Sequence, residues 1–450
     1  MKKKHLFAIS LIGLALAACS TDDELNAGGN QSNEGAVVTL KLDMAGSQTK
    51  GSPGATNQQV GTDAENEISN VTVVVDYGTT RNVFTSSDIY AGGYGWAEES
   101  NTFKFQTPAG DATFYVYANV NTADKLNSNW ATTLISQAKD VSEYYTANSF
   151  FMSNQNGEGV KHTINEDTEN NITVNIERAA AKVTVESKAD FTGDPHGGTI
   201  INNSMYFALG NTVDKFYLLQ QAGYTIPTVT YLDNPITTWN TRIDVAESTT
   251  ADIKTLPAIY CMENVHNSYV QGNTTYIKFK TTFVPGKILT FEEDETGNGL
   301  KVTGDTDFSS ESGVDFYVVL GATNSSLNSS YIKATDIDGK TGITIGAADK
   351  DGKCEVTGIE GITHISAKYK NGLCYFGPIW INLNEAGNES PIYRNDWYHL
   401  TVNSIKLPGS PTEPVIEEDD EDDPLTPPVD VTVKLTVMKW NLVEHNIDLQ

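Results

Sequence analysis

The feature that most constrains this chain is a recurring alternation of apolar and polar residues, interrupted by short turn-forming stretches. Clear runs with a period of two lie at 38–44, 71–77, 114–120, 172–176, 277–283 and 398–402. Side chains of a β-strand point alternately to opposite faces, so each run predicts a strand with one buried face. Strands at short intervals, separated by Gly, Asn and Asp turns, favour β-sandwiches. We therefore expect an all-β fold containing β-sandwich domains.

One stretch departs from this alternation and predicts a minor helical insertion. Its apolar residues recur at three- or four-residue spacing, which is typical of one face of a helix. These residues are Leu126, Trp130, Leu134, Ala138 and Val141. The composition elsewhere, with 37 Gly and 20 Tyr, suits strands and turns better than helices.

The N-terminus carries an export signal. Three lysines at positions 2–4 precede an apolar run at 6–18, which is too short to span a bilayer as a helix. The run ends in Leu16-Ala17-Ala18-Cys19, the pattern of a bacterial lipobox, in which the chain is cut before the Cys and the thiol receives a lipid. The competing interpretation is an ordinary secretory signal with a chance Cys. We expect a signal peptide over 1–19 and lipidation of Cys19.

Acidic residues dominate the chain, with 58 Asp and Glu against 30 Lys and Arg and a formal net charge of −28. This balance excludes a nucleic-acid binder built on a basic surface, and it argues against docking on anionic lipids. The acidic run at 20–24 resembles the signal that sends Bacteroidetes lipoproteins to the outer face of the outer membrane. A solvated acidic tether is the alternative interpretation. We expect an outer-membrane lipoprotein precursor at the cell surface.

Three cysteines remain once Cys19 is lipidated, namely Cys261, Cys354 and Cys374. Three thiols cannot all pair within one chain. Cys354 and Cys374 could form a bridge, although buried free thiols are favoured, because this is not the dense cysteine pattern of a disulfide framework.

Motifs for catalysis and cofactor binding are missing from the sequence. The seven His are scattered, and neither an HExxH motif nor a local His/Cys pair with zinc spacing occurs. A nucleophile elbow, a P-loop and a dinucleotide fingerprint are also lacking. We therefore predict no enzymatic activity, no catalytic or metal-binding residues, and no cofactor apart from the lipid on Cys19 of the precursor.

Two strands stand apart from the body of the chain. The first, at 37–44, follows a small polar tether. The second follows a linker at 406–430 that contains six prolines and an unbroken run of seven acids at 417–423. Proline stiffens such a linker and charge repulsion extends it, so we expect it to stay outside any packed core.

The strand beyond the linker offers alternating apolar residues, Val431, Val433, Leu435 and Val437. The apolar phase then flips to Met438, Trp440 and Leu442, which predicts a bulge or a bend. A sandwich that loses an edge strand exposes an apolar groove that another chain's strand can fill. We expect 431–450 to act as such a donor strand, and we expect the body of its own chain not to depend on it.

Five motifs carry a resemblance to a known family. They are the lipobox ending at Cys19; the first strand followed by Thr49-Lys50; the GTDAENEI stretch at 61–68; the YRNDWYHLTVNSI stretch at 393–405; and VMKWN at 437–441. Taken together, they resemble the fimbrillins of Bacteroidales, the subunits of type V pili, and the short-fimbria major subunit type in particular. The resemblance runs from end to end, although 190–390 carries almost no motif.

The resemblance implies two transthyretin-like β-sandwich domains, export as a lipoprotein, proteolytic removal of the first strand, and polymerisation by strand exchange. The family's cut commonly follows Arg. The only basic residues between 20 and 80 are Lys41, inside the strand, and Lys50, in a Gly/Ser/Pro loop. We therefore expect cleavage between Lys50 and Gly51.

These expectations divide the chain into a signal peptide (1–19), a propeptide (20–50), an N-terminal sandwich (51–190), a C-terminal sandwich (191–405), a linker (406–430) and a donor strand (431–450). The expected function is that of a pilus shaft subunit supporting adhesion. The expected partners are other copies of itself in a fibre, tip and anchor subunits, a maturation protease, and host or bacterial surface ligands.

Two other functions remain open at this point. A tip or anchor subunit would share the fold, but a tip would lack a spare C-terminal strand and an anchor would keep its N-terminus. A surface glycan-binding lipoprotein could stack sugars on the aromatic residues of a Gly-rich loop, Tyr90, Tyr94 and Trp96, unless these side chains cap a sandwich edge.

Overall fold

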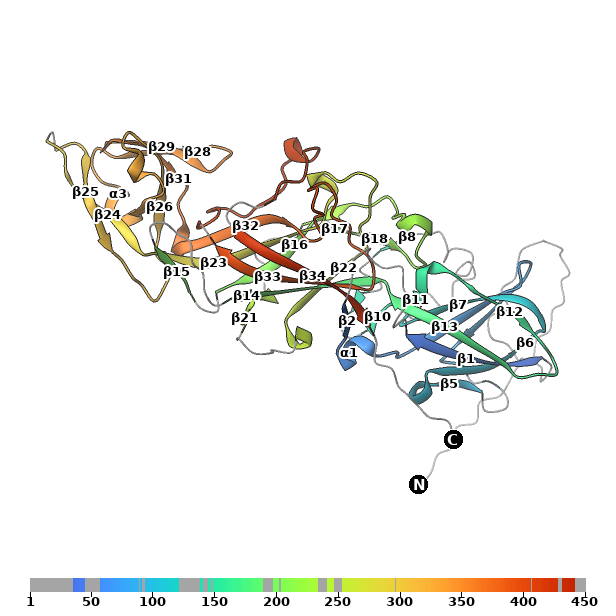
Figure 1. The fold of residues 1–450 in the computed structure, drawn as a ribbon. Coiled ribbons are helices and arrows are strands. Elements are labelled where there is room, and N and C mark those ends of the chain that lie inside the picture. Colours follow the sequence, from blue (N-terminus) through green and yellow to red (C-terminus); the bar gives the residue numbers. More distant parts are fainter. Residues whose placement is uncertain are drawn as a thin grey trace, which may run out of the picture.

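The computed structural model describes residues 35–44, 57–88, 90, 94–120, 138–140, 145–146, 149–188, 197–201, 204–233, 241–246, 253–295, 297–405, 407–427 and 431–441. The described residues are mostly strand, with two short α-helices, α1 (Asp63–Asn66) and α3 (Ala334–Ile337). The all-β prediction is confirmed. Figure 1 shows an elongated molecule, with the N-terminal strands at one end and the strands coloured yellow to light orange at the other.

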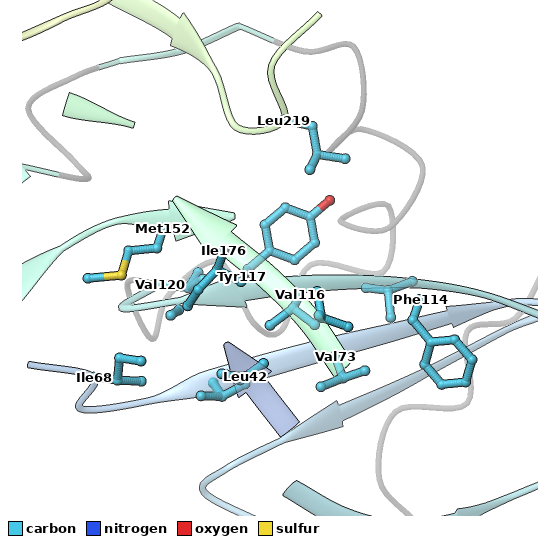
Figure 2. Packing of buried hydrophobic residues seen from close by; sticks show 14 of the residues in the cluster. Leu42, Ile68, Val73, Phe114, Val116, Tyr117, Val120, Met152, Ile176 and Leu219 are labelled. Atoms are coloured by element: carbon cyan, nitrogen blue, oxygen red, sulfur yellow. The ribbon is translucent and has the colours of Figure 1, made fainter. Parts of the chain in front are cut away.

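The N-terminal part is one sheet of nine strands with order β4-β3-β7-β11-β13-β1-β6-β5, and β12 also pairs with β7. The rings of Phe84 in β4 and Phe105 in β6 stack with centroids 4.2 Å apart. Strands from opposite ends of the sheet order therefore meet over one core, so this single sheet makes both layers of a sandwich. Figure 2 shows Leu42 of β1 in this core together with Val73, Val116 and Ile176. The strands are β1 (Ala36–Met44), β3 (Val71–Asp76), β4 (Arg81–Thr85), β5 (Gly95–Ala97), β6 (Thr102–Thr107), β7 (Gly110–Ala118), β11 (Met152–Asn154), β12 (Val160–Ile164) and β13 (Asn170–Arg178).

The central part is a second sandwich made of two sheets over a separate core. One sheet has the order β2-β34-β33-β14-β21, with β22 also on β14, and the other has the order β15-β23-β16-β20, with β32 on β23. The first contains β2 (Asn57–Val60), β14 (Ala180–Lys188), β21 (Asp244–Ala246), β22 (Ala258–Met262), β33 (Asp396–Ile405) and β34 (Val431–Asn441). The second contains β15 (Gly198–Ile200), β16 (Tyr206–Gly210), β20 (Thr241–Arg242), β23 (Tyr276–Pro285) and β32 (Leu373–Trp380).

A third packed unit, which the sequence did not indicate, lies at the far end of the molecule (Figure 1). It has its own core and two small sheets, and α3 packs into it through Ile337. Its strands are β24 (Lys287–Glu293), β25 (Leu300–Asp307), β26 (Phe316–Ala322), β27 (Tyr331–Lys333), β28 (Thr344–Ala348), β29 (Lys353–Thr357), β30 (Ile359–Glu360) and β31 (Ile362–Ser366). This unit is an insertion between β23 and β32, which are paired neighbours in the central sandwich.

Three pairs of short strands complete the described elements. They are β9 (Tyr145–Thr146) with β10 (Ser149–Phe150), β17 (Thr212–Val213) with β19 (Tyr231–Leu232), and β8 (Ala138–Asp140) with β18 (Lys215–Tyr217). The helix expected around 126–141 is wrong at 138–140, because this segment is a strand bonded to a distant part of the chain. The rest of that expected helix lies outside the described residues.

The chain passes from the first sandwich into the second at Ala179, between β13 and β14. This crossing comes before the expected division near residue 190. The buried residues on either side of it, Arg178 and Lys182, belong to a junction that also contains the end of β34.

Candidate functional site: the first and last strands

Strand β1 occupies an interior position in the first sheet. It runs parallel to β13 and antiparallel to β6, so that Leu40 lies opposite Ile172 on one side and Phe103 on the other. Val38, Leu40 and Leu42 are 0%, 0% and 2% exposed. Lys41, on the other face, is exposed. The alternation predicted for this strand is confirmed, and its apolar face is part of the core.

Removing β1 would therefore open a groove between β13 and β6. Burying one Val and two Leu side chains stabilises the sandwich by roughly 5–9 kcal/mol before ordering costs, at roughly 1.5–3 kcal/mol each. The edges of β13 and β6 would also lose their hydrogen-bonding partner, and open edges of this kind recruit other strands.

The last strand, β34, lies on its own chain. It pairs antiparallel with β33 from Val431 opposite Ile405 to Lys439 opposite Asp396. Val431 is buried, whereas Val433, Leu435 and Val437 are only partly buried against the central core. The four predicted donor residues thus share one face, and three of them remain partly accessible.

The flip in apolar phase has a different cause from the one expected. The register between β33 and β34 is continuous through Val437 and Met438, and the irregularity falls at Val402 and Ser404. Met438 and Trp440 are buried in the core of the first sandwich, whereas Val431 belongs to the central core. The strand thus changes its buried face because it crosses from one core to the other, and the expected bulge at the flip is wrong.

The expectation that the body does not depend on the tail stays a prediction, but the end of the tail packs into that body. Trp440 is 0% exposed; its ring stacks on Tyr260 at 5.6 Å between centroids and meets Phe150 edge-on at 5.3 Å. The tail therefore completes the contact between the two sandwiches in this form of the chain.

The linker likewise packs against the body, contrary to expectation. Leu425 is 6% exposed and clusters with Tyr276 and Trp380. The Trp380 Nε1–H donates to the Thr426 carbonyl at 2.9 Å. The backbone N–H groups of 271 and 272 donate to carbonyls at 423 and 421 at 2.9 and 2.8 Å. The acidic side chains of 417–423 mostly point into solvent, so the backbone can dock without burying their charge.

The junction between the sandwiches is organised around Arg178, the last residue of β13. Its Nη1 donates to the Trp440 carbonyl at 2.8 Å and its Nε donates to the Glu65 carbonyl at 3.0 Å. Its guanidinium carbon lies 4.2 Å from the centre of the Trp440 ring, within cation–π range. One side chain therefore connects the groove-forming strand β13, the segment containing α1, and the end of the tail.

Two of the charges at this junction form an ion pair. The Lys182 Nζ lies 2.8 Å from Glu65 Oε1, and both side chains are almost fully buried. Burial alone would raise the pKa of Glu65, but hydrogen bonds from Lys182 and Tyr260 and the Lys182 charge outweigh it, so the pKa is lowered. Burial lowers the pKa of Arg178, with Glu65 opposing.

A second buried ion pair adjoins the first. Arg394 and Glu263 form a salt bridge in which both side chains are 1% exposed. Glu177 lies nearby and accepts a hydrogen bond from the Asn156 N–H at 3.0 Å. Burial raises the pKa of Glu177 to about 7, although the charge of Arg394 opposes this. Glu177 is therefore a buried carboxyl that titrates near neutral pH.

Sequence reasoning missed the junction residues Arg178, Glu65, Lys182, Glu177 and Glu263. The available signal was the charged pair at 177–178, which interrupts an otherwise apolar stretch between Ile176 and Ala179. Charged residues are rarely fully buried unless they are paired, so such an interruption can mark either a surface turn or a paired junction.

Some of the remaining predicted site residues lie outside the described residues, and others are placed by the structure. Cys19, Lys50 and Gly51 lie outside the described residues. Tyr90 and Trp96 pack on the side of the sheet against Phe103, at 5.8 and 6.5 Å between ring centroids. This placement favours aromatic capping of a sandwich edge over a sugar-stacking platform.

Three of the four cysteines lie within the described residues. Cys261, Cys354 and Cys374 are buried free thiols, as favoured from the sequence. The described parts of the chain contain no cluster of three or more His, Cys, Asp and Glu that could hold a metal. Within those same ranges, neither helix has the length or apolar character that a membrane span requires.

Residues 367–446, which include β32, β33, the linker and β34, match a family described as "Major fimbrial subunit protein type IV, Fimbrillin, C-terminal". The C-terminal segment is fimbrillin-like. This match confirms the resemblance to fimbrillins and supports a role as a fimbrial subunit. It covers the part of the chain that contains β34 and its sheet neighbour β33.

Solved fimbrial proteins also align over much of the chain. A fimbrilin (fimA) from Porphyromonas gingivalis W83 is 13% identical, with 91% of this chain and 99% of that chain covered, at a TM-score of 0.47. The C-terminally truncated tip fimbrial protein Mfa3 from Porphyromonas gingivalis is 14% identical, with 90% and 100% covered, at 0.36. A fimbrial assembly protein from Parabacteroides distasonis ATCC 8503 is 12% identical, with 62% and 100% covered, at 0.32.

These TM-scores are too low for structural detail to be carried over, so the fimbrillin assignment rests on the C-terminal family match. No curated protein matches the chain.

Proposed function

We propose that this chain is the shaft subunit of a surface fimbria, made as a lipoprotein anchored through Cys19 and matured by a cut after Lys50. Maturation frees β1, and the β34 strand of one copy then fills the β1 site of the next copy. The partners are further copies of the chain, tip and anchor subunits, the maturation protease, and host or bacterial surface ligands. The adhesion role follows from fibre formation.

The observation that carries this proposal is the contrast in burial between the two strands. The apolar face of β1 is 0–2% exposed from Val38 to Leu42. The corresponding face of β34 leaves Val433, Leu435 and Val437 partly accessible. A β34 strand moved into an emptied β1 site would bury these three side chains more completely, which favours exchange. The same move would give up the present contacts of Met438 and Trp440 in the first core.

The chemical character of the two strands also corresponds. Each presents aliphatic residues on one face and Thr and Lys on the other, with Lys41 and Lys434 both exposed. The first sheet would accept β34 without burying a charge, because the lysine face of β1 already points into solvent.

The linker supplies the reach for such an exchange once it leaves the body. About 25 residues at ~3.1 Å each span ~80 Å when extended. Leaving the body would require the linker to give up Leu425 in the buried cluster with Tyr276 and Trp380, and the Glu413–Lys278 ion pair at 2.6 Å. Its exposed acids remain solvated in either position.

The experiment is assembly of the cut protein, followed by electron microscopy and by mild heating in SDS, which should show a ladder of oligomers. Val433→Asp combined with Leu435→Asp would place two charges in an apolar groove, at a cost of several kcal/mol each, so this variant should not extend fibres. Lys434→Asp is the matched control, because it introduces the same side chain on the exposed face.

Long fibres from the double variant would refute the tail as donor. Loss of fibres from both variants would also count against it, because Lys434 does not enter the core. Circular dichroism and size-exclusion chromatography of each variant ensure that folded monomers are compared.

A further inference from the structure

Strand β2 follows β1 in the chain, and Lys50 lies between them. Among the described strands, β2 has one sheet partner, which is the end of β34. The two strands run parallel, with Asn57 opposite Met438 and Val60 opposite Asn441. β34 is therefore covered on both sides at this end, by β33 and by β2.

The segment after β2 closes over the Trp440 side chain. A Cβ atom at Gly61 would lie 2.7 Å from the Trp440 Nε1, so only glycine fits at this position without displacement. Thr62 then caps α1, donating its N–H to Glu65 Oε2 at 2.7 Å. Glu65 forms the buried ion pair with Lys182 described above, which fixes this segment against the start of β14.

Arg178 attaches the end of β34 and the segment containing α1 to β13, the strand that borders the β1 site. It belongs to β13, the strand that pairs with β1 along Val38 to Met44. From there it donates to the Trp440 carbonyl and to the Glu65 carbonyl. The end of β34 is thus held by two elements. One is the segment of β2 and α1, which follows the propeptide, and the other is β13, which pairs with β1 of the propeptide.

We propose that β2 and Arg178 form a latch that keeps β34 in its own subunit until the chain is cut between β1 and β2. This inference rests on the proposed polymerisation and names its regulation. Before the cut, β2 is an internal strand, with β1 anchored ahead of it and α1 behind it. After the cut, β2 lies close to a chain end, and its one remaining covalent connection to a packed element is the one to α1.

The physical reason for release is the loss of this double anchorage. A four-residue strand next to a chain terminus frays more readily than one tethered at both ends. Fraying of β2 uncovers one side of Met438–Asn441 and the indole of Trp440 beyond Gly61. The cut that empties the β1 site thereby also loosens the strand that is to fill a neighbour's site.

The test is hydrogen exchange of the β34 amides, read by mass spectrometry on a full chain that carries a specific protease site after Lys50. We expect exchange over 438–441 to be at least tenfold faster after cutting, in dilute monomer, with β26 of the third packed unit, which has its own core, as an unchanged internal reference. In uncut protein, Gln58→Pro combined with Gln59→Pro should give the same acceleration, because proline removes the ladder donors of β2. Arg178→Lys should do so too, since lysine lacks the two separately placed donors, Nε and Nη1, that reach the Glu65 and Trp440 carbonyls.

Equal tail exchange before and after the cut would overturn the latch, as would slow exchange in the double-proline chain. Fibres growing from cut protein whose tail exchange had not changed would refute the latch while leaving polymerisation intact. A cut protein with a fast-exchanging tail but no fibres would support the latch and refute the proposed function.

Discussion

Leu40→Ala in β1 tests how firmly the groove holds its own strand. Leu40 is 0% exposed between Ile172 and Phe103, so truncation leaves a cavity in a filled core. Substitutions of this kind cost about 2–5 kcal/mol. After the cut β1 is held without a covalent link, so the same loss should increase the dissociation rate of the propeptide by about 30-fold to about 5,000-fold.

The assay follows a fluorescent label on the propeptide as it leaves the cut protein, together with denaturant unfolding of the uncut chain. Lys41→Ala is the control, because this exposed side chain should change stability by no more than about 0.5 kcal/mol. Release from Leu40→Ala at the same rate as from the Lys41→Ala control would refute the claim that the apolar face of β1 retains the propeptide.

Three further outcomes are expected. Cys19→Ala should abolish lipid labelling and surface fibres, and normal fibres on such cells would contradict the lipoprotein route. Lys50→Ala should leave uncut precursor that does not assemble, whereas N-terminal sequencing of wild-type fibres should begin at Gly51; a start at Ser20 would contradict the cut site. Because burial raises the Glu177 pKa to about 7, the folded state holds its proton more tightly, and stability should fall as pH rises from the unfolded value to about 7. Glu177→Gln should remove this loss, up to roughly 3 kcal/mol, and unchanged pH dependence of the unfolding free energy would contradict the assignment.

Local periodicity predicted individual strands well but did not reveal their partners. Val38, Leu40 and Leu42 read as a strand because their alternation is local. Their pairing with Ile172 is parallel and distant in sequence, so no local signal reports it. The third packed unit was missed for a similar reason, since it is an insertion between the paired strands β23 and β32.

The errors arose where tertiary contacts override local character. The acidic linker is expected to stay clear of any core, but Leu425, the partly buried Ile416 and the Glu413–Lys278 ion pair dock it on the body, together with its backbone carbonyls. The change of apolar phase at Met438 and Trp440 predicts a bulge or a bend, whereas these residues face a second core that only the arrangement of the two sandwiches supplies. Ala138 fitted a helical pattern, yet its segment pairs with Tyr217 as a strand.

The central claim is that β34 changes partners from β33 in its own chain to the β1 site of another. Before the cut, Lys434 lies opposite Thr401, so cysteines at these two positions should form a disulfide within one chain. In fibres, Lys434→Cys should instead cross-link to a second copy carrying a cysteine at Asn171, Thr173 or Asn175, the β13 positions opposite Thr39, Lys41 and Asp43 of β1.

Mixing the two cut proteins, each with one introduced cysteine and with Cys261, Cys354 and Cys374 replaced by Ser, and separating the products without reducing agent measures this directly. The account predicts a covalent dimer of one Lys434→Cys chain and one β13-cysteine chain, which appears only after cutting and only with assembly. Fibres that form without this dimer from any of the three β13 positions would contradict it, as would assembly of a cut Lys434→Cys, Thr401→Cys chain whose disulfide stays within the chain.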